Sequence, residues 1–267
     1  MRTDHARARK HLVEKFSDIV IGEEITHEIS LAARKTDANE KPERHDQACR
    51  RVTARFQSRF LRQYVARKLR SDPVYLAVYE SVRSSRDPLL DVGCGLGLLG
   101  FYLRERGFKN PIIGLDRDAR KIGAGKQVAG AYPEVDLRSQ NLQDRLPEFS
   151  GTVAMLDVLH YLSPVDQNNL LFRLAERIVS GGALLVRDCP CDGGIRYAAT
   201  FLAEKFAQLT SWNVPTPLYF PSRESIFRNF SPNEFTHDVK PLWGATPFNN
   251  HFFTLRRHAP VTVVSAE

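Results

Sequence analysis

Four residues at alternate positions, Asp91, Gly93, Gly95 and Gly97, form the segment of this chain best suited to bind a ligand. They follow two leucines, at a point where a buried strand would turn into a helix. Glycines at such a turn let the backbone bend sharply and approach a ligand with no side chain in the way. The N–H groups at the start of the next helix would face the same ligand. The alternative is an ordinary strand–helix turn that binds nothing.

The carboxylate of Asp91 separates two kinds of ligand. Residues 95–100 also match the dinucleotide pattern G-x-G-x-x-G, which is a weak indication alone. A carboxylate four residues before Gly95 would repel a pyrophosphate, but it suits a cofactor that carries an ammonium group. The pattern that includes Asp91 is therefore the more specific match. A nicotinamide oxidoreductase, in which Asp91 has no role, is disfavoured.

Asp116 is a second acid at the end of an apolar segment. It closes residues 111–116 and is followed directly by Arg117. Asp116 could serve only to cap the next helix, but Asp118 already has the side chain and the position for that role. We therefore treat Asp116 as a candidate binding residue.

Asp157 and His160 are the candidates for chemistry rather than for binding alone. Asp157 closes the apolar segment 153–157, and His160 follows it. An imidazole has the pKa best suited to accept a proton near neutral pH, so His160 is the first candidate. Asp157, Tyr161 and Asp188 are weaker candidates. The alternative for His160 is a histidine packed at the entrance of the next helix.

Alternating strands and helices would position all of these residues. Strands separated by helices of 10–15 residues indicate an α/β fold with a mostly parallel, doubly wound sheet, and right-handed crossovers fix most of its topology. A final antiparallel pair is predicted near the C-terminus, and helix caps begin residues 222–230 and 231–235. The predicted strands are 89–92, 111–116, 135–137, 153–157, 183–187, 239–243 and 252–256, and the predicted helices are 98–106, 118–131, 163–179 and 194–209.

The N-terminal quarter of the chain is basic. Residues 44–70 contain nine Lys/Arg and one acid, Asp46, whereas the chain after residue 72 is near neutral. We predict a basic helical extension or lid over residues 1–72 and a catalytic domain over residues 73–267. A flexible link at 35–44 precedes one helix, whose apolar positions recur at spacings of three and four: Cys49, Val52, Phe56, Phe60, Tyr64 and Val65. A second helix begins at Asp72-Pro73.

The composition is that of an ordinary globular protein. The chain has 267 residues, 42% hydrophobic and 26% charged, which is enough for a sizeable core. No apolar run approaches the roughly 18–20 residues that span a bilayer, and no secretory signal is recognisable, so a cytoplasmic location is expected. Cys189 and Cys191 lack a second Cys/His pair at zinc spacing, so we expect ordinary thiols and no metal.

Residues 89–97, Leu-Leu-Asp-Val-Gly-Cys-Gly-Leu-Gly, resemble the first motif of class I S-adenosylmethionine (SAM)-dependent methyltransferases. Residues 157–161 resemble the fourth motif, at the mouth of the active site, and residues 180–186 resemble the turn before the fifth strand. The resemblance covers residues 72–257 and implies a seven-stranded Rossmann-like sheet. In that family an acid at Asp116 grips the ribose, whereas Asn141 replaces the usual acid beside the adenine. The implied cofactor-binding residues are Asp91, Gly93, Cys94, Gly95, Gly97, Asp116, Arg117, Asn141, Leu142 and Asp157.

The resemblance implies in-line transfer of a methyl group to a substrate nucleophile. The fourth motif lacks the Asn/Asp-Pro-Pro-Tyr/Phe pattern of enzymes that methylate amino groups of nucleic acid bases, which favours O-methylation of a small molecule. Residues 157–162 and 241–250 also resemble methyltransferase-like proteins of aryl polyene pathways, which implies a phenolic polyketide substrate, free or bound to an acidic acyl carrier protein. Aromatic residues that could wall its pocket, or simply pack in the core, are Phe201, Phe206, Trp212, Tyr219 and Phe220.

Several alternatives remain open from the sequence. The Arg-rich helix could dock a carrier protein by charge complementarity, bind RNA phosphates, or act only as a lid with a solvated outer face. The chain could therefore be an RNA-modifying methyltransferase. It could also bind SAM without catalysis, as a scaffold.

Overall fold

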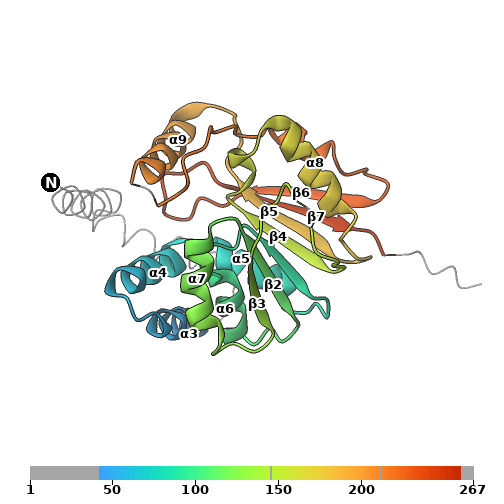
Figure 1. Cartoon of the computed structure of the whole chain (residues 1–267). Helices are drawn as coiled ribbons and strands as arrows, with labels where there is room; N and C mark the ends of the chain where they lie inside the picture. The colour runs from blue at the N-terminus through green and yellow to red at the C-terminus, as the bar shows by residue number, and fades with distance from the viewer. Residues whose placement is uncertain (1–41, 145, 211, 260–267) are drawn as a thin grey trace, which may run out of the picture.

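The computed structural model describes residues 42–144, 146–210 and 212–259. One seven-stranded sheet crosses it, with strand order β3-β2-β1-β4-β5-β7-β6 (Figure 1). Strands β1 to β5 are parallel, and β7 runs antiparallel to both of its neighbours, β5 and β6. The predicted α/β sheet with a final antiparallel pair is confirmed. The strands are β1 Leu89–Val92, β2 Ile112–Asp116, β3 Val135–Ser139, β4 Thr152–Leu156, β5 Ala183–Asp188, β6 Phe235–Pro241 and β7 His251–Arg257.

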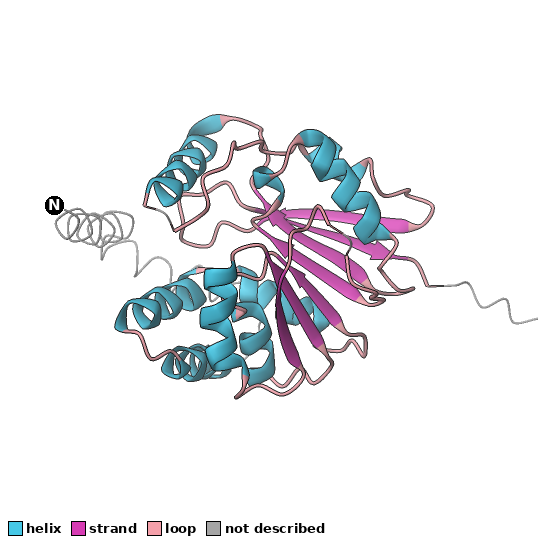
Figure 2. Cartoon of the chain, viewed as in Figure 1, coloured by secondary structure: helices cyan, strands magenta, loops and turns pink. Residues whose placement is uncertain are grey.

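Helices cover both faces of the sheet (Figure 2). Two predicted caps are confirmed: the side chain of Asp118 accepts a hydrogen bond from the N–H of Arg120, and that of Ser163 accepts one from the N–H of Asp166. The helices that follow β1 are α6 Leu98–Glu105, α7 Ala119–Ala129, the short η2 Leu159–Tyr161, α8 Pro164–Ala175, α9 Gly194–Leu209 and α10 Arg223–Phe227.

One predicted element near the C-terminus is wrong. Residues 231–235 were expected to start a helix, but they form a turn that leads into β6. The backbone oxygen of Ser231 accepts hydrogen bonds from the N–H groups of Glu234 and Phe235. Phe235 then pairs with Arg257 of β7 and is buried, so β6 begins four residues earlier than the apolar pattern indicated.

The single N-terminal helix predicted from the apolar spacing is two helices, α3 Pro42–Arg55 and α4 Arg59–Ser71. The chain bends between them because Ser58 is extended and its side chain caps α4, accepting from the N–H of Leu61. Phe56 lies at the bend, where it is buried against Phe101 of α6. The second predicted helix is present as α5 Val74–Val82, which follows Asp72-Pro73.

The core has two parts, because alternate residues of each strand point to opposite faces of the sheet. Leu89 and Ala154 belong to a cluster with α3 to α7, and Leu90 and Val153 belong to a cluster with α8 and α10. The described part of the N-terminal extension thus shares a core with the rest of the chain, although its separate role stays a prediction. The expectations for residues 1–41 lie outside the described residues. No helix in the described ranges is long and apolar enough to cross a membrane.

Candidate active site

A cavity of about 690 Å³ opens at the carboxyl ends of the parallel strands. Its walls come from the turns after β1, β2 and β4, from α4 and α9, and from the segment 212–219 that follows α9. β1 lies between β2 and β4, so the strand order reverses beside it, and ligands of open α/β sheets bind at such a point.

The glycine-rich turn forms one wall of this cavity. Gly93, Gly95 and Gly97 all have positive φ, between 58° and 77°, where a side chain is strained. A Cβ atom on Gly93 would lie 2.2 Å from a methyl carbon of Val158, whereas one on Gly95 would meet no atom within 4 Å. The turn therefore packs closely at Gly93 and opens at Gly95, as the sequence predicted for close approach of a ligand.

Asp91 is a buried carboxyl group that lines the cavity. Its exposed fraction is 3%, and none of the described residues forms an ion pair with it. Burial, together with the nearby charge of Asp116, raises the pKa of this carboxyl to about 7. A cationic ligand in the cavity would supply the positive partner that the Asp91 carboxylate lacks among the described residues.

Asp116 organises the turn as well as lining the cavity. Its Oδ2 accepts a hydrogen bond from the N–H of Gly95 at 2.8 Å, and its Oδ1 accepts one from the N–H of Asp118 at 2.8 Å. Each oxygen keeps a further lone pair for a ligand hydroxyl. Asn141 also lines the cavity, and its side-chain oxygen accepts from the N–H of Gln143 at 3.2 Å.

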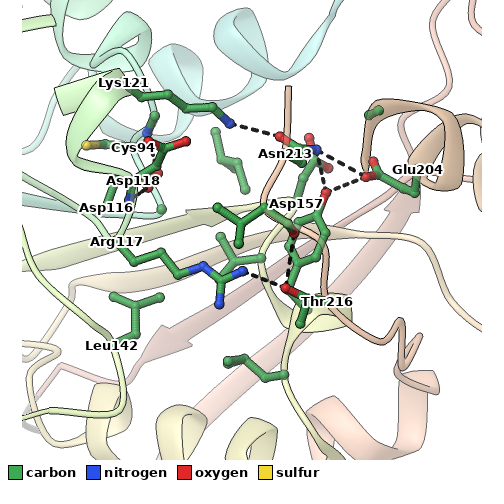
Figure 3. A pocket seen from close by; sticks show the side chains of 18 of the residues that line it. Cys94, Asp116, Arg117, Asp118, Lys121, Leu142, Asp157, Glu204, Asn213 and Thr216 are labelled. Atoms are coloured by element: carbon green, nitrogen blue, oxygen red, sulfur yellow. Dashed lines mark hydrogen bonds between the residues drawn. The ribbon is translucent and has the colours of Figure 1, made fainter. Parts of the chain in front are cut away.

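The segment 212–219 crosses from α9 to the turn after β2. Arg117 donates to the hydroxyl of Thr216 at 2.6 Å, and Lys121 donates to the side-chain oxygen of Asn213 at 2.8 Å (Figure 3). Trp212 packs against Tyr64 of α4, with ring centroids 4.4 Å apart. This segment and α4 thus form one side of the cavity together.

A buried ion-pair network joins α4 to the sheet. Arg187 of β5 binds both carboxylate oxygens of Asp157 and one of Asp72, and its exposed side-chain fraction is 2%. Lys68 contacts Asp72 at 2.7 Å and Asp157 at 3.8 Å. Burial opposes ionisation of Asp72, but the charges of Arg187 and Lys68 outweigh it and lower the pKa of its carboxyl. Asp157 has a positive φ of 59° and is held by these cations.

His160 is buried and is not among the residues that line the cavity. Its Nδ1 lies 2.9 Å from Oδ1 of Asp188, its Nε2 lies 3.9 Å from Oε2 of Glu204, and its ring stacks on Phe220. Burial alone would lower the pKa of the imidazole, but Asp188 and Glu204 raise it to about 10. A protonated ring cannot accept another proton, so a role for His160 as the proton acceptor remains a prediction that this geometry disfavours.

Glu204 of α9 is the site residue that sequence reasoning missed. The hydroxyl of Tyr161 donates a short hydrogen bond to its Oε2, and Asn213 donates to the Tyr161 oxygen at 2.7 Å. All three residues line the cavity. The sequence pattern predicted helix α9, but it did not indicate that an acid within this helix would line the cavity.

Most of the predicted site residues lie together in the structure. Three do not line the cavity: Gly97, which packs on Leu137 of β3, His160, and the weaker candidate Asp188. Of the five aromatic residues expected to wall a pocket, Trp212 and Tyr219 line it. The predicted residues that line the cavity are Asp91, Gly93, Cys94, Gly95, Asp116, Arg117, Asn141, Leu142 and Asp157.

Residues 89–182 match the sequence model of a family described as methyltransferase domain. This range begins at β1 and includes the glycine-rich turn, Asp116 and Asp157. Over this range the chain is similar to methyltransferase domains. No curated protein sequence matches the chain.

Solved structures with this fold include enzymes of more than one kind. Magnesium protoporphyrin IX methyltransferase from Synechocystis, with bound S-adenosylhomocysteine (SAH), is 18% identical with a TM-score of 0.55, over 79% of this chain and 92% of that one. An O-methyltransferase family 2 protein from Planctomyces limnophilus, in complex with apigenin, is 18% identical with a TM-score of 0.57, over 79% of this chain and 62% of that one. A [4+2]-cyclase is 14% identical with a TM-score of 0.53, over 70% of this chain and 82% of that one. At these identities the likeness concerns the fold alone.

The residues of the methyltransferase domain fit SAM. The cofactor carries an ammonium group, for which Asp91 is a buried carboxylate with no cation beside it among the described residues, and ribose hydroxyls, for which Asp116 has free lone pairs. The open space at Gly95 admits a ligand close to the backbone. The position of Asn141 in the cavity is consistent with the predicted contact to an adenine, which an amide can bond through its oxygen.

Proposed function

We propose that the chain transfers a methyl group from SAM to a hydroxyl group of a small molecule, with a phenol or an aromatic polyketide as the preferred class. The observation that carries the proposal is the buried Asp91 carboxylate, which opens onto a cavity and has no cation beside it among the described residues. The aromatic rings of Tyr64, Trp212 and Tyr219 in the same cavity support a flat, apolar acceptor.

SAM supplies an electrophilic methyl group when it is bound, so the protein has to align the acceptor and exclude water. Asp91 would hold the ammonium end of the cofactor and Asp116 its ribose, and the Arg187–Asp157 pair would fix the shape of the wall after β4. Trp212 and Tyr64 would close the cavity over the acceptor. Asp157 is bound to a guanidinium and would position neighbouring groups.

Calorimetric titration of the purified chain with SAM and SAH tests the cofactor site first. We expect micromolar binding by the wild type and loss of at least about tenfold in affinity for Asp116→Ala, because that carboxylate would bind the ribose and also orders the turn at Gly95. Asp136→Ala, on the exposed part of β3, is the matched control and should bind as the wild type does. No binding by folded wild-type protein would contradict the proposal.

A carrier protein is a second component of the proposal. Arg55, Arg59 and Arg62 are exposed on α3 and α4, beside the half-exposed ring of Phe60, and α4 lines the cavity. A basic, partly apolar surface next to the cavity suits an acidic acyl carrier protein that delivers a tethered acceptor. An RNA-modifying enzyme is the alternative partner class for the same surface.

Charge reversal distinguishes these partners. The triple variant Arg55→Glu/Arg59→Glu/Arg62→Glu should bind a purified acidic acyl carrier protein at least about tenfold more weakly, with a slower association rate. The control Lys109→Glu/Arg228→Glu/Lys240→Glu changes the net charge equally on other exposed positions and should have little effect. Equal carrier binding by both variants would contradict the carrier proposal, and strong, salt-sensitive binding of bulk RNA would favour the alternative.

The alternative is a chain that binds SAM without transferring its methyl group. The same fold occurs in a [4+2]-cyclase, so the fold alone does not decide between the two. Incubation with SAM and a panel of phenols, followed by mass measurement, distinguishes the two. A cytoplasmic location stays a prediction.

A further inference from the structure

The carboxylate of Glu204 has one occupied and one unoccupied oxygen. All of its polar contacts are made by Oε2. This oxygen accepts a short hydrogen bond from the Tyr161 hydroxyl, and it lies 3.4 Å from the side-chain nitrogen of Asn213 and 3.9 Å from Nε2 of His160. None of the described residues forms a hydrogen bond or an ion pair with Oε1. Glu204 lines the cavity with 22% of its side chain exposed, so a ligand can reach it.

The neutral side chains bonded to Glu204 direct their hydrogen-bond donors to Glu204 or to each other. The proton of the Tyr161 hydroxyl is directed to Glu204, and the Asn213 amide N–H groups are directed to Tyr161 and Glu204. The oxygen of the Asn213 side chain in turn accepts from Lys121 (Figure 3). A ligand at this wall therefore meets lone pairs, chiefly those of the Glu204 carboxylate.

The negative charge of Glu204 is maintained by the group behind it. His160 lies between Asp188 and Glu204. These carboxylates raise the pKa of its imidazole to about 10, so the ring carries a positive charge at neutral pH. Burial opposes ionisation of Glu204, but the charge of His160 and the hydrogen bond from Tyr161 outweigh it and lower the pKa of its carboxyl. Two lysines also act on Glu204, and both are engaged: Lys68 by Asp72 at 2.7 Å, and Lys121 by the side-chain oxygen of Asn213 at 2.8 Å.

We infer that Glu204, with Tyr161 beside it, is the recognition point for the methyl acceptor and selects acceptors that present an O–H or N–H donor over acceptors that present a carboxylate. This inference rests on the proposed function and names the substrate class more closely. A phenol or an amine can donate to Oε1 of Glu204. An acceptor carboxylate would face a second carboxylate with no donor between them. In this arrangement His160 is a positioning residue that acts through Glu204.

The test uses three ligands that share one flat scaffold, titrated into the full chain saturated with SAH. They are 2-naphthol, which carries a donor, 2-methoxynaphthalene, which carries none, and 2-naphthoate, which is an anion. The wild type should bind 2-naphthol about tenfold or more tightly than the methyl ether, and naphthoate most weakly. Glu204→Gln should remove most of the preference for 2-naphthol over the ether and should improve the binding of naphthoate.

Two controls separate recognition from folding. Glu176→Gln, an exposed acid after α8, should keep the wild-type order of affinities. Glu204→Gln should keep the wild-type affinity for SAH, which also shows that the variant is folded. If SAH binds but the three ligands bind equally, or none of them binds, or Glu204→Gln keeps the wild-type preference, the inference is wrong while the cofactor site stands. If SAH itself does not bind, the proposed function fails.

Discussion

Asp91→Asn is expected to lose SAH binding by about 100-fold or more and, at the same time, to make the ligand-free protein more stable at pH 8. The binding loss follows because a buried charge-assisted contact to the ligand's ammonium group is removed. The gain in stability follows because the wild type keeps a 3% exposed carboxylate in the cavity without a cation. One variant thus separates the contribution of Asp91 to binding from its contribution to folding.

The pH dependence of this effect has a definite sign. Burial, with the charge of Asp116, raises the folded-state pKa of Asp91 to about 7, so the folded state binds a proton more tightly than the unfolded state does. The free energy of unfolding that Asp91 contributes is therefore lost as pH rises from its ordinary pKa of 3.8 to about 7. At pH 8 we expect Asp91→Asn to be more stable than the wild type by about 2–4 kcal/mol, or about 5–10 °C in melting temperature.

Calorimetry and thermal melting between pH 5 and pH 8 measure both effects. The wild-type affinity for SAH should rise by about tenfold between pH 6 and pH 8, as Asp91 ionises, and Asp91→Asn should show no such rise. Asp136→Asn, on the exposed edge strand, should change neither quantity. Unaltered SAH affinity in Asp91→Asn would show that the ammonium group binds elsewhere.

The arrangement of the residues proposed to bind the cofactor could be predicted from the sequence because their geometry is local. Asp91, Gly93 and Gly95 lie within five residues of one another, and a buried strand followed by a helix fixes their arrangement. Asp116 closes the adjacent strand, so strand order alone brings it within 2.8 Å of the N–H of Gly95. Short-range pattern and sheet topology were sufficient here.

The acceptor half of the site could not be predicted in this way. Glu204 reaches the cavity from α9 through the packing of a helix against η2 and the 212–219 segment, which no periodicity encodes. The sequence also placed His160 next to Asp157 at the end of β4 without indicating that its ring turns away from the cavity toward Asp188. Intrinsic pKa made His160 the first candidate for proton acceptor, but two neighbouring carboxylates change that pKa by tertiary contact.

The break between α3 and α4 shows the same limit in the fold. The apolar spacing continues through Phe56 and Phe60, so it predicted one helix, yet Ser58 ends the repeat with a side-chain cap. Because the chain bends there, Phe56 is buried at 2% exposure while Phe60 is 41% exposed. The bend also directs α4 over the cavity, where Tyr64 and Lys68 line it.

Arg187→Met is expected to destabilise the protein by about 3–5 kcal/mol, because it leaves the carboxylates of Asp72 and Asp157 with Lys68 as their only cation among the described residues. For a chain of this size that loss corresponds to about 10 °C in melting temperature. Arg138→Met, at an exposed position of β3, should change the melting temperature little. Thermal or urea unfolding at pH 7 measures the difference.

A compensating variant shows whether unpaired charge is the cause. Arg187→Met/Asp72→Asn removes the buried carboxylate together with its cation and should recover part of the lost stability.

The stability that the network provides also depends on pH. Because the pKa of Asp72 is lowered in the folded state, the contribution of the wild-type network to the free energy of unfolding is fully present above the ordinary pKa of 3.8 and is lost as pH falls further. The difference between wild type and Arg187→Met should therefore be constant from pH 8 to pH 5 and shrink below about pH 4. If the double variant is no more stable than Arg187→Met, lost packing of the arginine side chain explains the effect instead. The network would then serve to place α4 over the cavity rather than to balance charge.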